Sequence, residues 1–197
     1  MTKAYNHFIG GEMVTGRSGH YRDIFNPSLG DISGTVSLAN LEEVDLAVKS
    51  AQEAFPGWAA LNPQRRARVM FNFKGLIEKH ADELALIISE EHGKVLADSH
   101  GDIQRGLDVI EFACGIPHLT KGEYSQGAGP GIDVYSMRQP IGVAVGITPF
   151  NFPAMIPMWM FGVAIATGCT FVLKPSEKDP GVPLRLCLLY TSPSPRD

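Results

Sequence analysis

The stretch that decides the fold is GITPFNFPAMIPMWMFGVAIATGCTFVLKP, residues 146–175, within a run from residue 139 to residue 173 that has no charged side chain. This run is long enough for a membrane-spanning helix. Pro149, Pro153 and Pro157 crowd its first half, however, and no basic cluster flanks it, which argues against a span. It divides instead into GVAVGIT, an apolar helical segment and TFVLKP. The stretch therefore predicts a strand, a crossover helix and a second strand parallel to the first.

The overall composition is that of a globular chain with one substantial core. Of 197 residues, 44% are hydrophobic and 19% are charged, and the formal net charge is -4. No lysine or arginine cluster is interleaved with aromatic residues. We therefore expect neither a nucleic-acid partner nor a membrane partner, and small molecules are the expected ligands.

Cysteine usage and the N-terminus bear on the cellular compartment. Cys114, Cys169 and Cys187 form no C-x-x-C pair, so we expect no metal site and no disulfide framework, as suits a reducing compartment. The opening MTKAYNHFIGGE has neither an apolar signal region nor an Arg-rich presequence. These features predict a cytoplasmic protein.

Short strands and a first helix are predicted in the N-terminal part of the chain. HFIGGEMV and YRDIFNPSLGDISGTVSLA are typical of strands joined by Gly and Asn-Pro turns. Asn40 followed by Glu43 predicts an N-terminal capping box. Pro56-Gly57 is expected to end that helix.

Further helices are predicted between residues 62 and 114. Asn62 before Pro63 is typical of a helix start, and the three arginines that follow are expected on the solvated face of that helix: Arg65, Arg66 and Arg68. Another helix ends at Gly93, and a fourth begins at about Ser99 and carries Cys114 as a packing residue. The alternating residues of GIDVYSM then predict an exposed hairpin strand.

A ligand site is expected at the carboxyl ends of the two parallel strands, because open α/β sheets bind ligands there. Those ends are TPFN and KPSE. Neither a G-x-G-x-x-G nor a G-x-x-x-x-G-K-[ST] motif is present in the sequence, so the pattern alone leaves the ligand open.

Two paired motifs, PIGVAVGITPFNFPAMIPMWMF and TFVLKPSE, resemble the aldehyde dehydrogenase superfamily, whose members bind nicotinamide cofactors on a Rossmann-like sheet without the usual glycine fingerprint. Within it, NPQRRARVMFNF, EHGK, GDIQRGLDVIEFACGIPHLTKGEYS and DPGVPLRL are similar to the CoA-acylating methylmalonate-semialdehyde dehydrogenases. The likeness runs from about residue 7 to residue 186.

This resemblance implies an α/β fold: a truncated Rossmann-like NAD-binding domain of the aldehyde dehydrogenase type with part of an oligomerisation hairpin. The implied segments are N-terminal strands and helices of the NAD-binding domain at 1–121, a hairpin at 122–140, the first βαβ unit at 141–186 and a non-native tail at 187–197. The catalytic domain is absent from this division. The full-length parent is implied to be a homo-oligomer, expected to be a tetramer.

The implied reaction is oxidative and CoA-acylating. A cysteine thiolate attacks methylmalonate or malonate semialdehyde, NAD takes the hydride, and CoA as co-substrate releases propionyl-CoA or acetyl-CoA, in valine and inositol catabolism. Two alternatives stay open: a non-acylating enzyme such as succinate-semialdehyde dehydrogenase, or a non-catalytic NAD-binding module.

The resemblance also assigns roles to single residues. Asn151 corresponds to the asparagine whose amide donates to the oxyanion, although the residues alone favour an Asx turn before Phe152-Pro153. Arg105 matches an arginine expected to bind the substrate carboxylate, with ordinary solvent exposure as the alternative.

The remaining matched residues are assigned to the cofactor. Lys174 and Glu177 correspond to the pair that holds the adenosine ribose, because an ammonium and a carboxylate can hydrogen-bond to adjacent hydroxyls. Thr148 and Phe150 would line the cofactor groove, and Lys178 would lie at its adenosine end.

The sequence departs from the family at its C-terminal end. The family's nucleophilic cysteine is expected downstream of this chain, in a G-x-x-C context, so the chain alone is expected to be inactive. In the segment CLLYTSPSPRD, residues 187–197, Pro193 and Pro195 are expected to prevent a helix, and the segment resembles translated adapter sequence. A genuine disordered terminus is the alternative.

Overall fold

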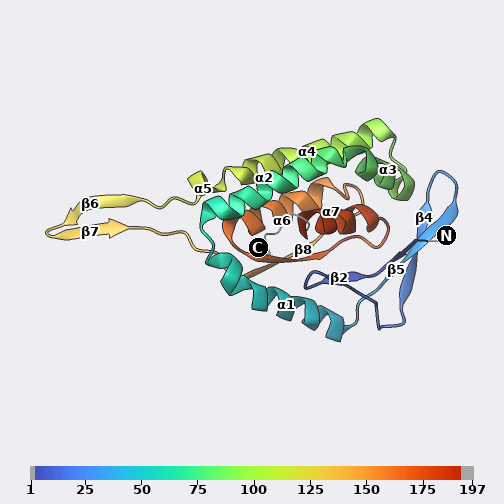
Figure 1. Cartoon of the computed structure of the whole chain (residues 1–197), viewed down its shortest axis with the longest axis horizontal. Coiled ribbons are helices and arrows are strands. Elements are labelled where there is room, and N and C mark those ends of the chain that lie inside the picture. The colour runs from blue at the N-terminus through green and yellow to red at the C-terminus, as the bar shows by residue number, and fades with distance from the viewer. Residues whose placement is uncertain (1–2, 192–197) are drawn as a thin grey trace.

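The predicted strand, helix and strand form the centre of the computed structural model, which describes residues 3–191. Strands β8 (Val143–Ile147) and β9 (Thr170–Lys174) pair in parallel, in register from Val143 opposite Thr170 to Ile147 opposite Lys174. Helix α6 (Met155–Thr167) packs on one face of this pair and α1 (Leu41–Ala59) on the other (Figure 1). The prediction of a parallel βαβ unit is confirmed.

None of the helices in the described part of the chain combines the length and apolarity that a membrane crossing requires.

Close contact between helices fixes α6 in place. Helix α4 (Leu96–Cys114) crosses α6 where each contributes a glycine. A Cβ atom at Gly106 would lie 2.0 Å from Cε of Met158, and one at Gly162 would lie 2.6 Å from Cδ1 of Ile110. A larger residue at either position would force the Met158 or Ile110 side chain to move, because packed interiors leave no room for an added methyl group.

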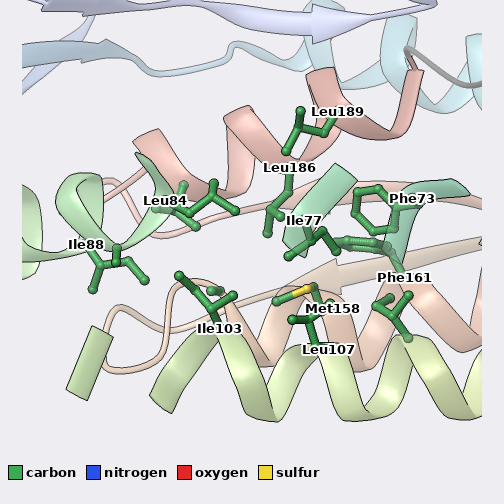
Figure 2. Close-up of a cluster of buried hydrophobic side chains, with 14 residues drawn as sticks. Phe73, Ile77, Leu84, Ile88, Ile103, Leu107, Met158, Phe161, Leu186 and Leu189 are labelled. Atoms are coloured by element: carbon green, nitrogen blue, oxygen red, sulfur yellow. The ribbon is translucent and has the colours of Figure 1, made fainter. Parts of the chain in front are cut away.

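The main hydrophobic core lies among α6 and four further helices (Figure 2). These helices are α2 (Pro63–Lys79), α3 (Ala81–His92), α4 and α7 (Gly181–Thr191). Phe73, Ile77, Leu84, Ile103 and Met158 are almost wholly inaccessible to solvent. Each such side chain contributes about 1.5–3 kcal/mol by leaving water, so the core holds the βαβ unit against the helices.

The remaining elements are strands and one short helix. The N-terminal strands form two sheets: β1 (Lys3–Tyr5), β5 (Asp31–Ser37) and β4 (Tyr21–Asn26) in that order, and β2 (His7–Ile9) with β3 (Glu12–Val14). After α5 (Ile116–Leu119), β6 (Tyr124–Gly129) and β7 (Ile132–Tyr135) form an antiparallel hairpin. The hairpin projects away from the body of the molecule, as an exposed strand pair was predicted to do (Figure 1).

Both predicted helix caps are present. Asn40 and Glu43 form a reciprocal capping box at the start of α1, and Oδ1 of Asn62 accepts from the backbone N–H of Arg65 at the start of α2. Gly93, with φ of 86°, ends α3 as predicted. Helix α4 begins at Leu96, slightly earlier than the sequence indicated.

Three other predictions about these helices are wrong. Helix α1 continues through Pro56 to Ala59, because the indole N–H of Trp58 donates to the carbonyl of Ile165 at 2.9 Å and holds the last turn. Arg66 is buried rather than solvated, being only 5% exposed, because its guanidinium donates to backbone carbonyls.

The third correction concerns the C-terminal segment. Helix α7 continues through residues 187–191, and Leu189, 3% exposed, belongs to the main core. A proline restricts itself and the residue before it, which leaves these positions free to be helical. Pro193 and Pro195 lie outside the described residues, and the origin of the segment stays a prediction.

Candidate functional site

The carboxyl ends of β8 and β9 bring two loops together. The backbone N–H of Thr148 donates to the carbonyl of Lys174 at 3.1 Å, one step beyond the last residue pair of the parallel ladder. The loop that starts at Thr148 leads into α6, and the loop that starts at Pro175 leads into α7. TPFN and KPSE, which are far apart in the sequence, therefore leave the sheet side by side.

A buried ion pair between α4 and the residue Lys94 holds the loop that leads from Thr148 into α6. Asp102 of α4 is fully buried, and its Oδ1 accepts from the backbone N–H of Met155 at 2.8 Å. Its Oδ2 accepts from Nζ of Lys94 at 3.1 Å, and the same ammonium lies 4.1 Å from the ring centroid of Phe152. Asp102 and Lys94 thus hold both the start of α6 and the residue next to Asn151.

Sequence reasoning missed Asp102 and Lys94. A signal for Asp102 existed, because Ser99, Asp102 and Gly106 follow each other at helical spacing on the side of α4 that is buried. The motif EHGK contains Lys94, but nothing in the sequence shows that its charge points to a carboxylate on the next helix.

Asn151 is exposed, and its side-chain amide makes no hydrogen bond within residues 3–191. The Asx turn considered from the sequence is therefore not formed. An amide free at the carboxyl end of β8 remains able to donate to a ligand. Its assignment to an oxyanion stays a prediction.

The second loop carries the charged residues assigned to the cofactor. Nζ of Lys174 lies 3.2 Å from Oε2 of Glu177, and both side chains are about half exposed. A hydrogen bond from the backbone N–H of Glu177, and the Lys174 ammonium, lower the pKa of the Glu177 carboxyl. At neutral pH Glu177 is a carboxylate that accepts hydrogen bonds.

An aromatic residue links the two loops. Nζ of Lys178 lies 4.1 Å from the ring centroid of Phe150, and the His92 ring stacks against Phe150 with centroids 6.3 Å apart. The structure thus brings Thr148, Phe150, Lys174, Glu177 and Lys178 together at one edge of the sheet.

Arg105 lies apart from these residues, on a neighbouring cavity. Its exposed guanidinium helps to line a cavity of about 320 Å³ that also contains Lys94, Asp98 and Phe152. Among the described residues Arg105 has no carboxylate partner, whereas Lys94 is paired with Asp102. Arg105 is therefore exposed, as one reading of the sequence expected, and also faces a concave surface beside the first loop.

None of the three cysteines is placed as a nucleophile for this site. Cys169 immediately precedes β9, at the opposite end of the sheet from Asn151. Cys114 packs in a second core cluster at the far end of α6, and burial raises its pKa. Burial also raises the pKa of Cys187, in α7, to about 11. Thiols with raised pKa values are poor nucleophiles at neutral pH.

The edge fits a dinucleotide in its donors and acceptors. Oγ1 of Thr148 is buried and makes no hydrogen bond to any described residue, although buried hydroxyls nearly always have a partner. Beside it lie one ammonium and one carboxylate at a spacing suited to adjacent hydroxyls. These features define an α/β protein with a candidate nucleotide site at the carboxyl edge of a parallel sheet.

Comparison with known proteins identifies the family. The sequence model described as "Aldehyde dehydrogenase family" matches residues 13–193, and the chain belongs to that family. The resemblance seen in the two paired motifs is thereby confirmed.

Two similar proteins are named as semialdehyde dehydrogenases. The chain is 48% identical over 185 residues to the malonate-semialdehyde dehydrogenase of Pseudomonas aeruginosa and 50% identical over 183 residues to the mitochondrial acylating methylmalonate-semialdehyde dehydrogenase of Arabidopsis thaliana. These matches cover 94% and 93% of this chain, but 37% and 30% of the relatives. The chain thus spans about a third of their length.

A solved structure shows the same fold. A Sinorhizobium meliloti protein assigned as a methylmalonate-semialdehyde dehydrogenase, in complex with NAD, superimposes with a TM-score of 0.96 at 56% identity. The match covers 98% of this chain and 39% of that protein. The predicted truncated α/β fold of the aldehyde dehydrogenase type is confirmed.

Proposed function

We propose that this chain is the N-terminal part of an NAD-dependent, CoA-acylating dehydrogenase of methylmalonate and malonate semialdehyde, which forms propionyl-CoA and acetyl-CoA in valine and inositol catabolism. The observation that carries the proposal is the position of Asn151 and the Lys174–Glu177 pair on the joined ends of β8 and β9. The names of the similar proteins support the choice of substrate.

The described residues divide the cofactor work among them. Lys174 and Glu177 hold the adenosine ribose through its hydroxyls, and Lys178 lies at the adenosine end. Phe150 and the Thr148 hydroxyl line the groove, where Thr148 would gain the hydrogen bond that it lacks within the described residues. When bound, NAD accepts the hydride that leaves the substrate.

Two groups of this chain act on the substrate: the hydrogen-bond donor of Asn151 and the cation of Arg105. The Asn151 amide donates to the oxygen that becomes negative when a thiolate attacks the aldehyde carbon. The Arg105 guanidinium holds the substrate carboxylate through two N–H donors. Asp102 and Lys94 keep Asn151 in place by fixing the residues that follow it.

The attacking thiol is proposed to belong to a part of the parent protein outside residues 1–197, because the cysteines of this chain are buried away from Asn151 or carry raised pKa values. The chain alone would then have no dehydrogenase or acyl-transfer activity. The β6–β7 hairpin, exposed along both strands, is proposed as part of a tetramer interface, and the cytoplasm as the location.

The test uses an enzyme of family length that contains this sequence. NADH formation from methylmalonate semialdehyde should require CoA and should yield propionyl-CoA, identified by mass spectrometry. Equal turnover without CoA, with the free acid as product, would instead indicate the non-acylating alternative. NAD binding without turnover of any semialdehyde would indicate the non-catalytic module.

A further inference from the structure

A second buried carboxylate lies directly behind the cofactor loop. Asp179 is 2% exposed, and neither of its carboxylate oxygens meets the geometry of a hydrogen bond within the described residues, although the Ser176 hydroxyl lies close enough to lower its pKa. It follows Lys178 in the chain and precedes the start of α7 by two residues. Free N–H groups at a helix start are the donors that a nearby carboxylate ordinarily uses.

The first of these N–H groups, that of Gly181, already donates to another acid, Glu91. Oε2 of Glu91, from α3, accepts from the backbone N–H of Gly181 at 2.8 Å, and Oε1 accepts from the hydroxyl of Tyr5 at 2.6 Å. Glu91 is itself 5% exposed. Because Glu91 satisfies the start of α7, Asp179 is buried without a donor of its own.

The charges around Asp179 come from every element packed behind the loop. Burial, the charge of Glu91 from α3 and that of Asp102 from α4 raise the pKa of Asp179 to about 7. Ser176 in the same loop and Lys94 oppose this rise but do not overcome it. Tyr5 donates to Glu91, and the His92 ring stacks on Phe150 with its buried Nδ1 making no hydrogen bond within the described residues.

A negative charge on Asp179 would make the arrangement shown unfavourable. The ammonium of Lys94 is committed to Asp102 at 3.1 Å, and an unpaired buried carboxylate is costly. Water could stabilise the ionised carboxylate of Asp179, and for water to reach it residues 175–180 would have to move towards solvent. Glu177 lies two residues before Asp179 in this loop, so the motion would separate Glu177 from Lys174.

We infer that Asp179 is a positioning residue for the cofactor loop: as a neutral acid it allows the buried packing in which Glu177 lies beside Lys174, and its ionisation releases the loop and weakens cofactor binding. The link to binding rests on the cofactor site proposed above. The effect on the loop itself does not.

The first experiment measures the fold alone. The carboxyl group of Asp179 should titrate near pH 7, against 3.8 for an unperturbed aspartate. The native state, which holds the proton more tightly than the unfolded chain, then loses stability as pH rises from about 4 to about 7. Asp179→Asn should unfold at the same denaturant midpoint as the wild-type chain at pH 4 and at a higher midpoint at pH 8.

Asp45→Asn, at an exposed position of α1, is the matched control and should show no such difference between the two pH values. A pH-independent difference for Asp179→Asn would overturn the inference. Should this variant fail to fold, ¹³C NMR of the wild-type Asp179 carboxyl decides, and a titration near pH 4 would overturn the inference.

The second experiment measures NAD affinity by calorimetry on residues 1–197. If only the neutral form of Asp179 binds, the dissociation constant rises about tenfold from pH 6 to pH 8. Asp179→Asn should bind at both pH values with the affinity that the wild-type chain has at pH 6. An identical pH dependence in both proteins would overturn the link to binding. A pH-dependent unfolding difference with no NAD binding by either protein would overturn the proposed cofactor site but support the role of Asp179 in the loop.

Discussion

Both ends of the βαβ unit bury polar side chains, but only the carboxyl end, beside its paired Asp102 and Lys94, also leaves polar groups without hydrogen bonds to described residues. At the amino end of β9, the guanidinium of Arg66 donates to the carbonyls of Ala59, Leu61, Ala166 and Thr167, which leaves the last turn of α6 tied to α2. At the carboxyl end, Asp179 and the hydroxyl of Thr148 are buried without hydrogen bonds to described residues.

This difference suggests that the amino end of the βαβ unit has a structural role and that the carboxyl end has a binding role. Buried polar groups are nearly always hydrogen-bonded, and exceptions require an explanation. The satisfied end is built to hold the sheet to the helices. At the other end, the Thr148 hydroxyl is left for the cofactor in the function proposed above.

The largest effect is expected at the satisfied end. Arg66→Met should lower the free energy of unfolding by about 3–5 kcal/mol, because carbonyls that Arg66 satisfies lose their donor. Arg65→Met, at the exposed neighbouring position, is the control and should change it by less than about 0.5 kcal/mol. Urea unfolding measures both, and equal losses would remove the distinction between the two ends.

At the unsatisfied end, Asn151→Ala should act on catalysis. In an enzyme of family length it should lower turnover by about 10²- to 10³-fold and leave NAD affinity nearly unchanged, because one oxyanion donor is lost. Steady-state kinetics and calorimetry measure these quantities. A wild-type turnover number would show that Asn151 does no chemistry.

The cavity beside the first loop should show a smaller, substrate-dependent effect. Arg105→Leu should weaken use of methylmalonate semialdehyde by about 1.5–3 kcal/mol in kcat/KM, since a charge-assisted contact to the carboxylate is lost. Propanal, which has no carboxylate, should be spared. Arg68→Leu, on the exposed side of α2, is the control. Equal losses on both aldehydes would assign Arg105 to structure.

The smallest effect concerns cofactor choice. The Glu177 carboxylate would lie beside the 2'-phosphate of NADP and repel it, so NAD should be preferred. Glu177→Gln should reduce the preference by about fivefold, the value of roughly 1 kcal/mol for two charges at 4 Å in water. The ratio of kcat/KM with the two cofactors measures it. Comparable efficiency of the unaltered enzyme with both would contradict the role of Glu177.

Local patterns were sufficient to predict the fold but not its polar interior. Prolines and glycines divide the uncharged run into strand, helix and strand, and Asn40 and Asn62 mark helix starts, because these effects act within a few residues. Arg66 lies four residues before Met70 and seven before Phe73, on the apolar stripe, but its charge suggested solvent. Its carbonyl partners include Ala166 and Thr167, 100 and 101 residues away.

In the candidate site, too, some residues could be located from the sequence and others could not. TPFN and KPSE could be located from the rule that ligands bind at the carboxyl ends of parallel strands. Helical spacing could indicate that Asp102 is buried, but it could not identify the partners of Asp102 or Glu91, because each accepts from a backbone N–H of a distant segment, at Met155 and Gly181. Such long-range hydrogen bonds follow from tertiary packing and leave no periodic trace in the sequence.

The comparison of the two ends is tested most directly by titrating NAD into residues 1–197 and following backbone amide signals by NMR. Amides of residues 148–151 and 174–178 should shift on binding, whereas those of residues 59–66 and 166–168 should not. Shifts confined to the Arg66 end, or no shifts at either end at millimolar NAD, would contradict the assignment of the cofactor site to the carboxyl edge.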